Sequence, residues 1–122
     1  MKKILIVDDS LYMRELIKSA LSGTGKYVVV GEAPNGNMGI ELALELKPDA
    51  ITMDNILPDM IGIDVVKELR KEEVDAKIIM VSAVGQENVI QEGISSGAND
   101  YLIKPFNSET LIQKIDNLFI AQ

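Results

Sequence analysis

Short apolar segments alternate five times with amphipathic ones along this chain, and this alternation limits its fold more than any other feature. The apolar segments are nearly continuous, which is typical of strands buried on both faces of a parallel sheet. They lie at residues 3–8, 27–32, 49–54, 77–82 and 99–103. In the segments that follow them, apolar residues recur at the i, i+3, i+4, i+7 spacing of a helix, first at Met13, Leu16, Ile17 and Ala20.

This pattern predicts an α/β fold in which helices cover both faces of one doubly wound, five-stranded parallel sheet. The length fits a single domain spanning residues 1–122. The last predicted helix runs almost to the final residue, so we expect no output domain. Three helix ends are marked by residues that stop or cap helices: Pro48 beyond the second, Gly97 after the fourth and Asn107 or Ser108 before the fifth.

The composition excludes several classes of chemistry. With no cysteine there are no disulfides or thiolate metal sites, and with no histidine there is no Ser-His-Asp triad, histidine zinc site or phosphohistidine. The net charge of −7 disfavours nucleic-acid binding, which depends on basic contacts to phosphates. No segment reaches transmembrane length, and the first apolar segment is too short for a signal peptide. We expect a cytoplasmic protein with no nucleic-acid or membrane partner.

Polar side chains stand at the ends of four predicted strands: Asp8 and Asp9, Asp54, Ser82 and Lys104. Each has an ordinary interpretation as a turn, cap or surface residue. The carboxyl ends of parallel strands, however, meet at one edge of the sheet, where ligands bind in open α/β folds. Three carboxylates gathered there repel one another unless a cation joins them, and Mg²⁺ prefers such oxygen ligands. The sequence therefore predicts a divalent metal and a phosphoryl group at this edge.

Over essentially its whole length the chain resembles the receiver domain of bacterial two-component response regulators, most closely the stand-alone CheY-like type. The matching motifs are Ile4 to Ser10, Met53-Asp54, Leu57-Pro58 with Gly62, Val81-Ser82-Ala83, and Tyr101 to Phe106. This resemblance implies a flavodoxin-like (βα)5 fold with strand order 2-1-3-4-5. It also implies a cis bond between Lys104 and Pro105.

The resemblance also implies roles for the acidic residues. Asp54 corresponds to the residue that a sensor histidine kinase phosphorylates. One Mg²⁺ ion, which Mn²⁺ could replace, would be bound by Asp9, Asp54 and the backbone carbonyl of Ile56, with Asp8 acting through water.

Further roles follow for residues at the ends of the fourth and fifth strands. Lys104 would pair first with Asp54 and then with the phosphoryl group. Ser82 would contact the phosphoryl group, and the small Ala83 leaves room for it. Ser82 and Tyr101 would form a switch pair: the hydroxyl moves toward the phosphoryl group, and the ring turns into the vacated space. The face of the fourth helix, fifth strand and fifth helix would then change.

The resemblance predicts a single-domain response regulator that is not an enzyme, apart from catalysing its own phosphorylation and dephosphorylation. Its partners would be a sensor kinase, a downstream protein and a phosphatase, and we expect a monomer. The first output to consider is a flagellar motor switch in chemotaxis, with Tyr101, Ile94 and Lys114 on the docking face. Alternatives are a phosphorelay that passes phosphate to a histidine phosphotransfer domain, or a phosphorylation-independent binding module.

Some residues near the acceptor depart from the family pattern, namely Asn55, Ile56 and Ile61. Ile56 and Val84, two positions beyond Asp54 and Ser82, flank the approach of the hydrolytic water in this family. Neither aliphatic side chain can orient water and both can exclude it, so we expect slow self-dephosphorylation.

Two other functional classes fit less well. A phosphatase of the haloacid dehalogenase type needs Asp-x-Asp after its first strand, whereas Asp8 and Asp9 are adjacent, and this chain has no room for the usual cap domain. A flavodoxin-like FMN carrier needs a phosphate loop rich in Ser, Thr and Gly at that place, where these two carboxylates would repel a phosphate.

Overall fold

The computed structural model of the chain describes residues 1–83 and 87–120. Its elements alternate in order, as predicted: β1 (Lys2–Val7), α1 (Leu11–Ser22), β2 (Tyr27–Ala33), α2 (Gly36–Leu46), β3 (Ala50–Asp54), α3 (Gly62–Lys71), β4 (Lys77–Ala83), α4 (Glu87–Ser96), β5 (Asp100–Lys104) and α5 (Ser108–Leu118). Each strand agrees with its predicted range to within one residue at either end. Within the described ranges, no helix is long and apolar enough to cross a bilayer.

All five strands are parallel and lie in the order β2-β1-β3-β4-β5, which confirms the predicted topology. The register aligns the carboxyl ends of the inner strands, because Val7 pairs with Met53 and Asp54 with Val81. Lys104, at the end of β5, pairs with Ala83. The residues that follow β1, β3, β4 and β5 therefore meet at one edge of the sheet.

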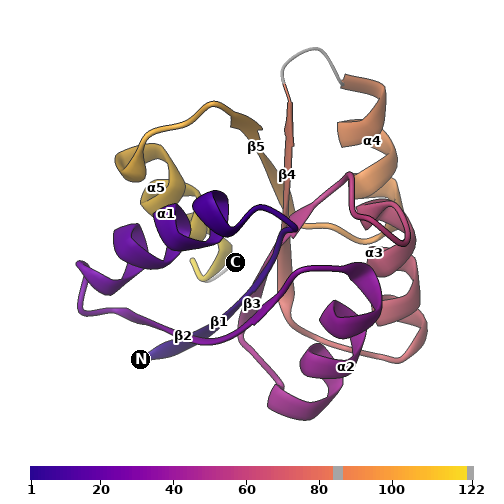
Figure 1. Ribbon diagram of the computed structural model, residues 1–122, viewed down its shortest axis with the longest axis horizontal. Helices are drawn as coiled ribbons and strands as arrows, with labels where there is room; N and C mark the ends of the chain where they lie inside the picture. The colour runs from indigo at the N-terminus through magenta and orange to yellow at the C-terminus, as the bar shows by residue number, and fades with distance from the viewer. Residues whose placement is uncertain (84–86, 121–122) are drawn as a thin grey trace.

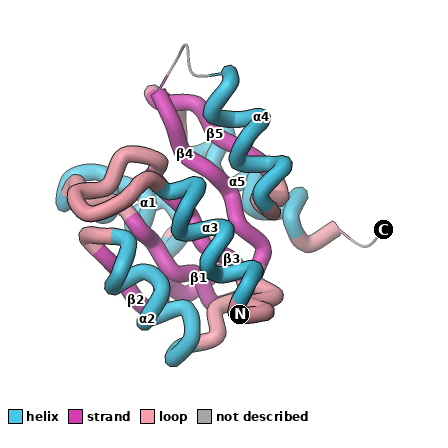
Figure 2. The backbone as a smooth tube through the Cα atoms, turned by 90° about the vertical axis from the view of Figure 1, so that its right-hand side faces the viewer, coloured by secondary structure: helices cyan, strands magenta, loops and turns pink. Residues whose placement is uncertain are grey.

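Helices cover both faces of the sheet (Figure 1). On one face, α1 and α5 pack over a core that includes Ile17, Leu111 and Ile115. On the other, α2, α3 and α4 lie side by side across the strands, as Figure 2 shows, over a core that includes Val66 and Leu69. Because apolar side chains from the same strands alternate between these two cores, the strands must be apolar almost throughout.

Capping residues mark the helix boundaries, at Asn107 and Gly97 as the sequence predicted. Ser10 and Asn107 accept hydrogen bonds at their side-chain oxygens from the amide nitrogens of Met13 and Thr110, at 3.2 and 2.8 Å. Gly97 follows α4 with a φ of +125°, a backbone conformation that L side chains rarely adopt. The bond between Lys104 and Pro105 is cis.

Candidate functional site

Three carboxylates converge at the carboxyl edge of the sheet. Asp8 and Asp9 lie in the turn between β1 and α1, and Asp54 is the last residue of β3. One carboxylate oxygen from each lies within 4.8 Å of the others. Asp8 is 2% exposed and the Asp54 side chain 11%, whereas Asp9 is exposed. The sequence prediction that these acids gather is therefore confirmed.

Lys104 lies between two of these acids. Its Nζ is 3.3 Å from Oδ2 of Asp8 and 3.4 Å from Oδ1 of Asp54. These distances exceed the ~2.7–2.9 Å of a tight charge-assisted hydrogen bond, so one ammonium group is shared between two carboxylates. Lys104 is therefore part of the site, and its alternative interpretation as a surface lysine is wrong.

The cluster carries more negative charge than Lys104 can offset. Burial raises the pKa of Asp54, and the neighbouring charge of Asp8 raises it further, while Lys104 acts in the opposite direction. Three carboxylates facing one ammonium group suit an additional cation, and their oxygens are the ligands that Mg²⁺ prefers. The donor set therefore fits the divalent ion expected from the sequence.

The loop after Asp54 is held close to the end of β3. Gly62 N donates to the carbonyl oxygen of Asn55 at 2.6 Å, and Ile56 pairs with Ile61 in an antiparallel bridge. Ile61 therefore closes the loop, although its side chain cannot cap α3. Ile56, two residues beyond Asp54, is 64% exposed. Its carbonyl as a metal ligand stays a prediction, and Val84 lies outside the described residues.

Ser82 lies within β4, opposite Ile103, and is only 3% exposed. This position excludes its alternative interpretation as a cap of α4. Its Oγ has no hydrogen-bond partner among residues 1–83 and 87–120. An unpaired buried hydroxyl costs free energy, so a ligand that accepted its hydrogen bond would be favoured. Ala83, the next residue, is exposed at the strand end.

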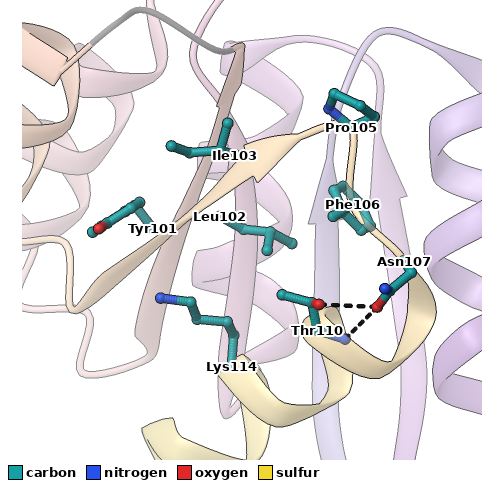
Figure 3. Close-up of a pocket in the computed structure, with 8 residues that line it drawn as sticks. All are labelled: Tyr101, Leu102, Ile103, Pro105, Phe106, Asn107, Thr110 and Lys114. Atoms are coloured by element: carbon teal, nitrogen blue, oxygen red, sulfur yellow. Dashed lines mark hydrogen bonds between the residues drawn. The ribbon is translucent and has the colours of Figure 1, made fainter.

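Tyr101 lies on the outer strand of the sheet and is 37% exposed. Lys114 Nζ lies 4.6 Å from the centre of its ring and 3.3 Å from Oδ1 of Asp100. Figure 3 shows both side chains at a groove between β5 and α5, which Phe106 and Thr110 also line. The ring is therefore at the surface in this structure, and its switch pairing with Ser82 stays a prediction.

Sequence reasoning missed two residues that join the loops at this edge of the sheet to other elements. Arg14, in α1, donates from Nη1 to the carbonyl oxygen of Asp8 at 2.7 Å. Asp59, in the loop after β3, accepts from the amide nitrogens of Gly36 and Asn37 at 2.8 and 2.9 Å, and so caps α2. Neither contact has a local sequence signal, because the partners come from different elements.

Comparisons with known proteins agree with this geometry. The family model of the response regulator receiver domain matches residues 4–116. The chemotaxis protein CheY of Thermotoga maritima is 43% identical over 117 residues, which cover 96% of this chain and 97% of that protein. CheY of Bacillus subtilis is 41% identical over 114 residues, covering 93% and 94%. The crystal structure of the response regulator domain of T. maritima CheB is similar at a TM-score of 0.89, with 33% identity and coverage of 100% and 99%.

Proposed function

Because this chain belongs to the response regulator receiver domain family, we propose that it accepts a phosphoryl group on Asp54 from the phosphohistidine of a sensor kinase. One observation carries the proposal: Lys104 lies between Asp8 and Asp54 at the carboxyl edge of the sheet, beside Asp9. Such a set of groups can both offer a nucleophilic carboxylate and neutralise a phosphoryl group. We further propose a stoichiometric phosphoacceptor in the cytoplasm rather than an enzyme that turns over a separate substrate.

The position of Asp54 supports its role as the nucleophile among the three acids. Asp8 is buried, and its Oδ1 and Oδ2 already accept from Ser10 N and Lys104 Nζ. Asp9 is exposed at the rim of the turn. Asp54 ends β3, the central strand, beside the end of β4, so groups from both neighbouring strands surround an incoming phosphoryl group.

In the transfer, an oxygen of Asp54 forms a bond to phosphorus as the bond from phosphorus to the kinase histidine nitrogen breaks. The electron pair stays on the imidazole, which takes up a proton. The Lys104 ammonium group pairs first with the Asp54 carboxylate and then with the oxygens of the transferred phosphoryl group. Mg²⁺, held by Asp9, Asp54 and the Ile56 carbonyl, with Asp8 through water, would supply electrostatic stabilisation of the phosphoryl charge.

Phosphorylation would then alter a surface distant from the acceptor. The modification replaces one carboxylate charge by about −2 and adds acceptor oxygens. The Ser82 hydroxyl, which has no hydrogen-bond partner within residues 1–83 and 87–120, is well suited to donate to one of them. We propose that Ser82 moves toward the phosphoryl group as it donates, and that Tyr101 then turns inward into the vacated space. This would change the face formed by α4, β5 and α5.

The output that the relatives favour is chemotaxis, since the curated relatives above are chemotaxis proteins. We propose that the phosphorylated chain, as a monomer, docks a flagellar motor switch through that face. Ile94 is 42% exposed there and lines a pocket with Tyr101, whose ring Lys114 contacts. Substituting Tyr101→Ala should abolish phosphorylation-dependent binding to the motor component. The binding is measured by pull-down, with beryllofluoride in place of the phosphoryl group. Undiminished binding would contradict the assignment of this face as the docking surface. A phosphorelay role would instead appear as transfer of label to a histidine phosphotransfer domain.

The decisive experiment incubates the protein with Mg²⁺ and acetyl phosphate and measures intact mass. We expect a gain of one phosphoryl group that is lost in Asp54→Asn and without Mg²⁺. Asp64→Asn, which removes an exposed acid of α3, is the matched control and should be phosphorylated like the wild type. If the wild type neither gains mass nor binds beryllofluoride, the chain is a phosphorylation-independent binding module.

A further inference from the structure

Arg14 reaches back from the first turn of α1 to the turn that carries Asp8 and Asp9. Its Nη1 donates to the carbonyl oxygen of Asp8 at 2.7 Å, and its Nε donates to Oε1 of Glu32 in β2 at 3.1 Å. The Arg14 side chain is only 14% exposed. The rigid guanidinium group therefore donates from two of its nitrogens, one to a backbone carbonyl and the other to a carboxylate.

The carbonyl of Asp8 belongs to the peptide unit that links Asp8 to Asp9. Because a peptide unit is planar, fixing this oxygen fixes the plane from which Asp9 leaves the backbone. Two further contacts hold this turn. The Asp8 amide donates to Ala33 O at 3.0 Å, and the Ser10 amide, which follows Asp9, donates to Asp8 Oδ1 at 2.8 Å. Arg14 holds the peptide plane between Asp8 and Asp9 itself, from which the Asp9 side chain departs.

Arg14 is itself oriented by a supporting group. Oε1 of Glu32 accepts from Arg14, while Oε2 accepts from Lys18 Nζ at 2.8 Å. Glu32 thus holds the guanidinium group from β2, and Lys18 holds Glu32 from the next turn of α1. Lys18, Glu32 and Arg14 thus form a series of contacts. Of these three, Arg14 is the residue that contacts the turn carrying the acidic cluster.

We propose that Arg14 is a positioning residue for divalent-cation binding: by holding the peptide between Asp8 and Asp9, it places the Asp9 carboxylate where it can share a cation with Asp54. This inference rests on the proposed function. Outer groups that orient ligand residues typically change metal affinity by ~10–100-fold when removed.

Electrostatic repulsion alone predicts the opposite effect on cation affinity, so an experiment can distinguish the two explanations. A positive charge near a cation site repels the cation, so deleting the charge of Arg14 should tighten metal binding if charge were its only contribution. A purely structural ion pair between α1 and β2 would change stability and leave the affinity as it is. Only a positioning role predicts weaker binding when a positive charge is removed.

The test measures the dissociation constant of Mn²⁺, from the spin-resonance signal of the free ion, and of Mg²⁺ by calorimetry, with no phosphodonor present. We expect Arg14→Gln to raise both constants about tenfold. Arg14→Lys should restore part of the affinity, because an ammonium group can still donate to the Asp8 carbonyl. Glu32→Gln should raise the constants less than Arg14→Gln. The matched control is Lys26→Gln, which removes a positive charge from the ion pair with Asp116 at the amino end of β2 and should leave the constants unchanged.

The outcomes separate this inference from the proposed function. A wild type that takes up neither ion overturns both. A wild type that binds, with Arg14→Gln and Glu32→Gln binding equally well or more tightly, overturns the positioning role alone. Circular dichroism verifies that each variant is folded. If Arg14→Gln is not, Arg14→Lys decides, because it keeps the charge and alters only the donor geometry: weaker binding than the wild type supports the positioning role, and equal binding overturns it.

Discussion

Gly62 packs directly against the backbone carbonyl of Asp54, so closely that a Cβ atom at residue 62 would collide with the carbonyl oxygen. Gly62 N also donates to Asn55 O at 2.6 Å, so the two segments cannot move apart without breaking this contact. The glycine is therefore required by the close approach of two backbones beside the phosphoacceptor.

Substituting Gly62→Ala should destabilise the fold by about 1–3 kcal/mol, the usual cost of overpacking a closely packed site. It should also slow phosphorylation by acetyl phosphate, because Asp54 must shift with its own carbonyl. Chemical denaturation and intact mass measure the two effects. Gly23→Ala is the control: nothing but backbone oxygens at 3.8 Å lies near its Cβ position, and its stability should hardly change.

Ile56→Asn should accelerate loss of the phosphoryl group. The Ile56 side chain is 64% exposed two residues beyond Asp54, where an amide could orient an attacking water and an aliphatic group cannot. The rate is followed by intact mass after removal of acetyl phosphate. Ile56→Val, which keeps an apolar surface, should decay as slowly as the wild type, and equal rates for all three proteins would contradict the role of this position.

Thr52→Val should stabilise the protein by about 1 kcal/mol. Thr52 is 1% exposed in β3, and its hydroxyl finds no hydrogen-bond partner in the part of the chain that the structure describes. Valine has the same shape without the unpaired polar atom, so the desolvation cost is removed. Thr24→Val is the opposite control, because Thr24 Oγ1 donates to Leu21 O and accepts from Lys26 N, and it should lower the urea midpoint.

Glu32 should make part of the stability pH-dependent. The hydrogen bond from Lys18, aided by Arg14, lowers the pKa of Glu32 from its ordinary 4.5, despite partial burial. The folded state thus holds the Glu32 proton less tightly than the unfolded state, so its contribution is complete above pH 4.5 and is lost as pH falls through the lowered value. The stability difference between wild type and Glu32→Gln, from urea unfolding, should shrink on acidification. A difference that stays constant with pH would contradict this.

Much of the fold follows from local patterns. Continuous apolar segments can be buried only between two layers of helices, and helix ends at Ser10, Asn107 and Gly97 depend on neighbours a few residues away. The gathering of Asp8, Asp9 and Asp54 also follows once the strands are parallel, since their ends must share an edge. The alternation of elements therefore predicts a doubly wound parallel sheet with the polar groups at one edge, whereas the strand order that makes β1 and β3 neighbours came from the family resemblance.

The sequence by itself determined the order of elements, the apolar faces and the edge at which the polar groups gather, because these depend on periodicity and short-range capping. Only the tertiary structure decided that Lys104 is shared between two acids and that Arg14 holds the Asp8 carbonyl. It also decided that the Ser82 hydroxyl has no hydrogen-bond partner among the residues that the structure describes. Those outcomes depend on side-chain directions and separations of a few tenths of an ångström between elements far apart in the chain. They are fixed when the crossovers pack against the sheet, and no local pattern encodes them.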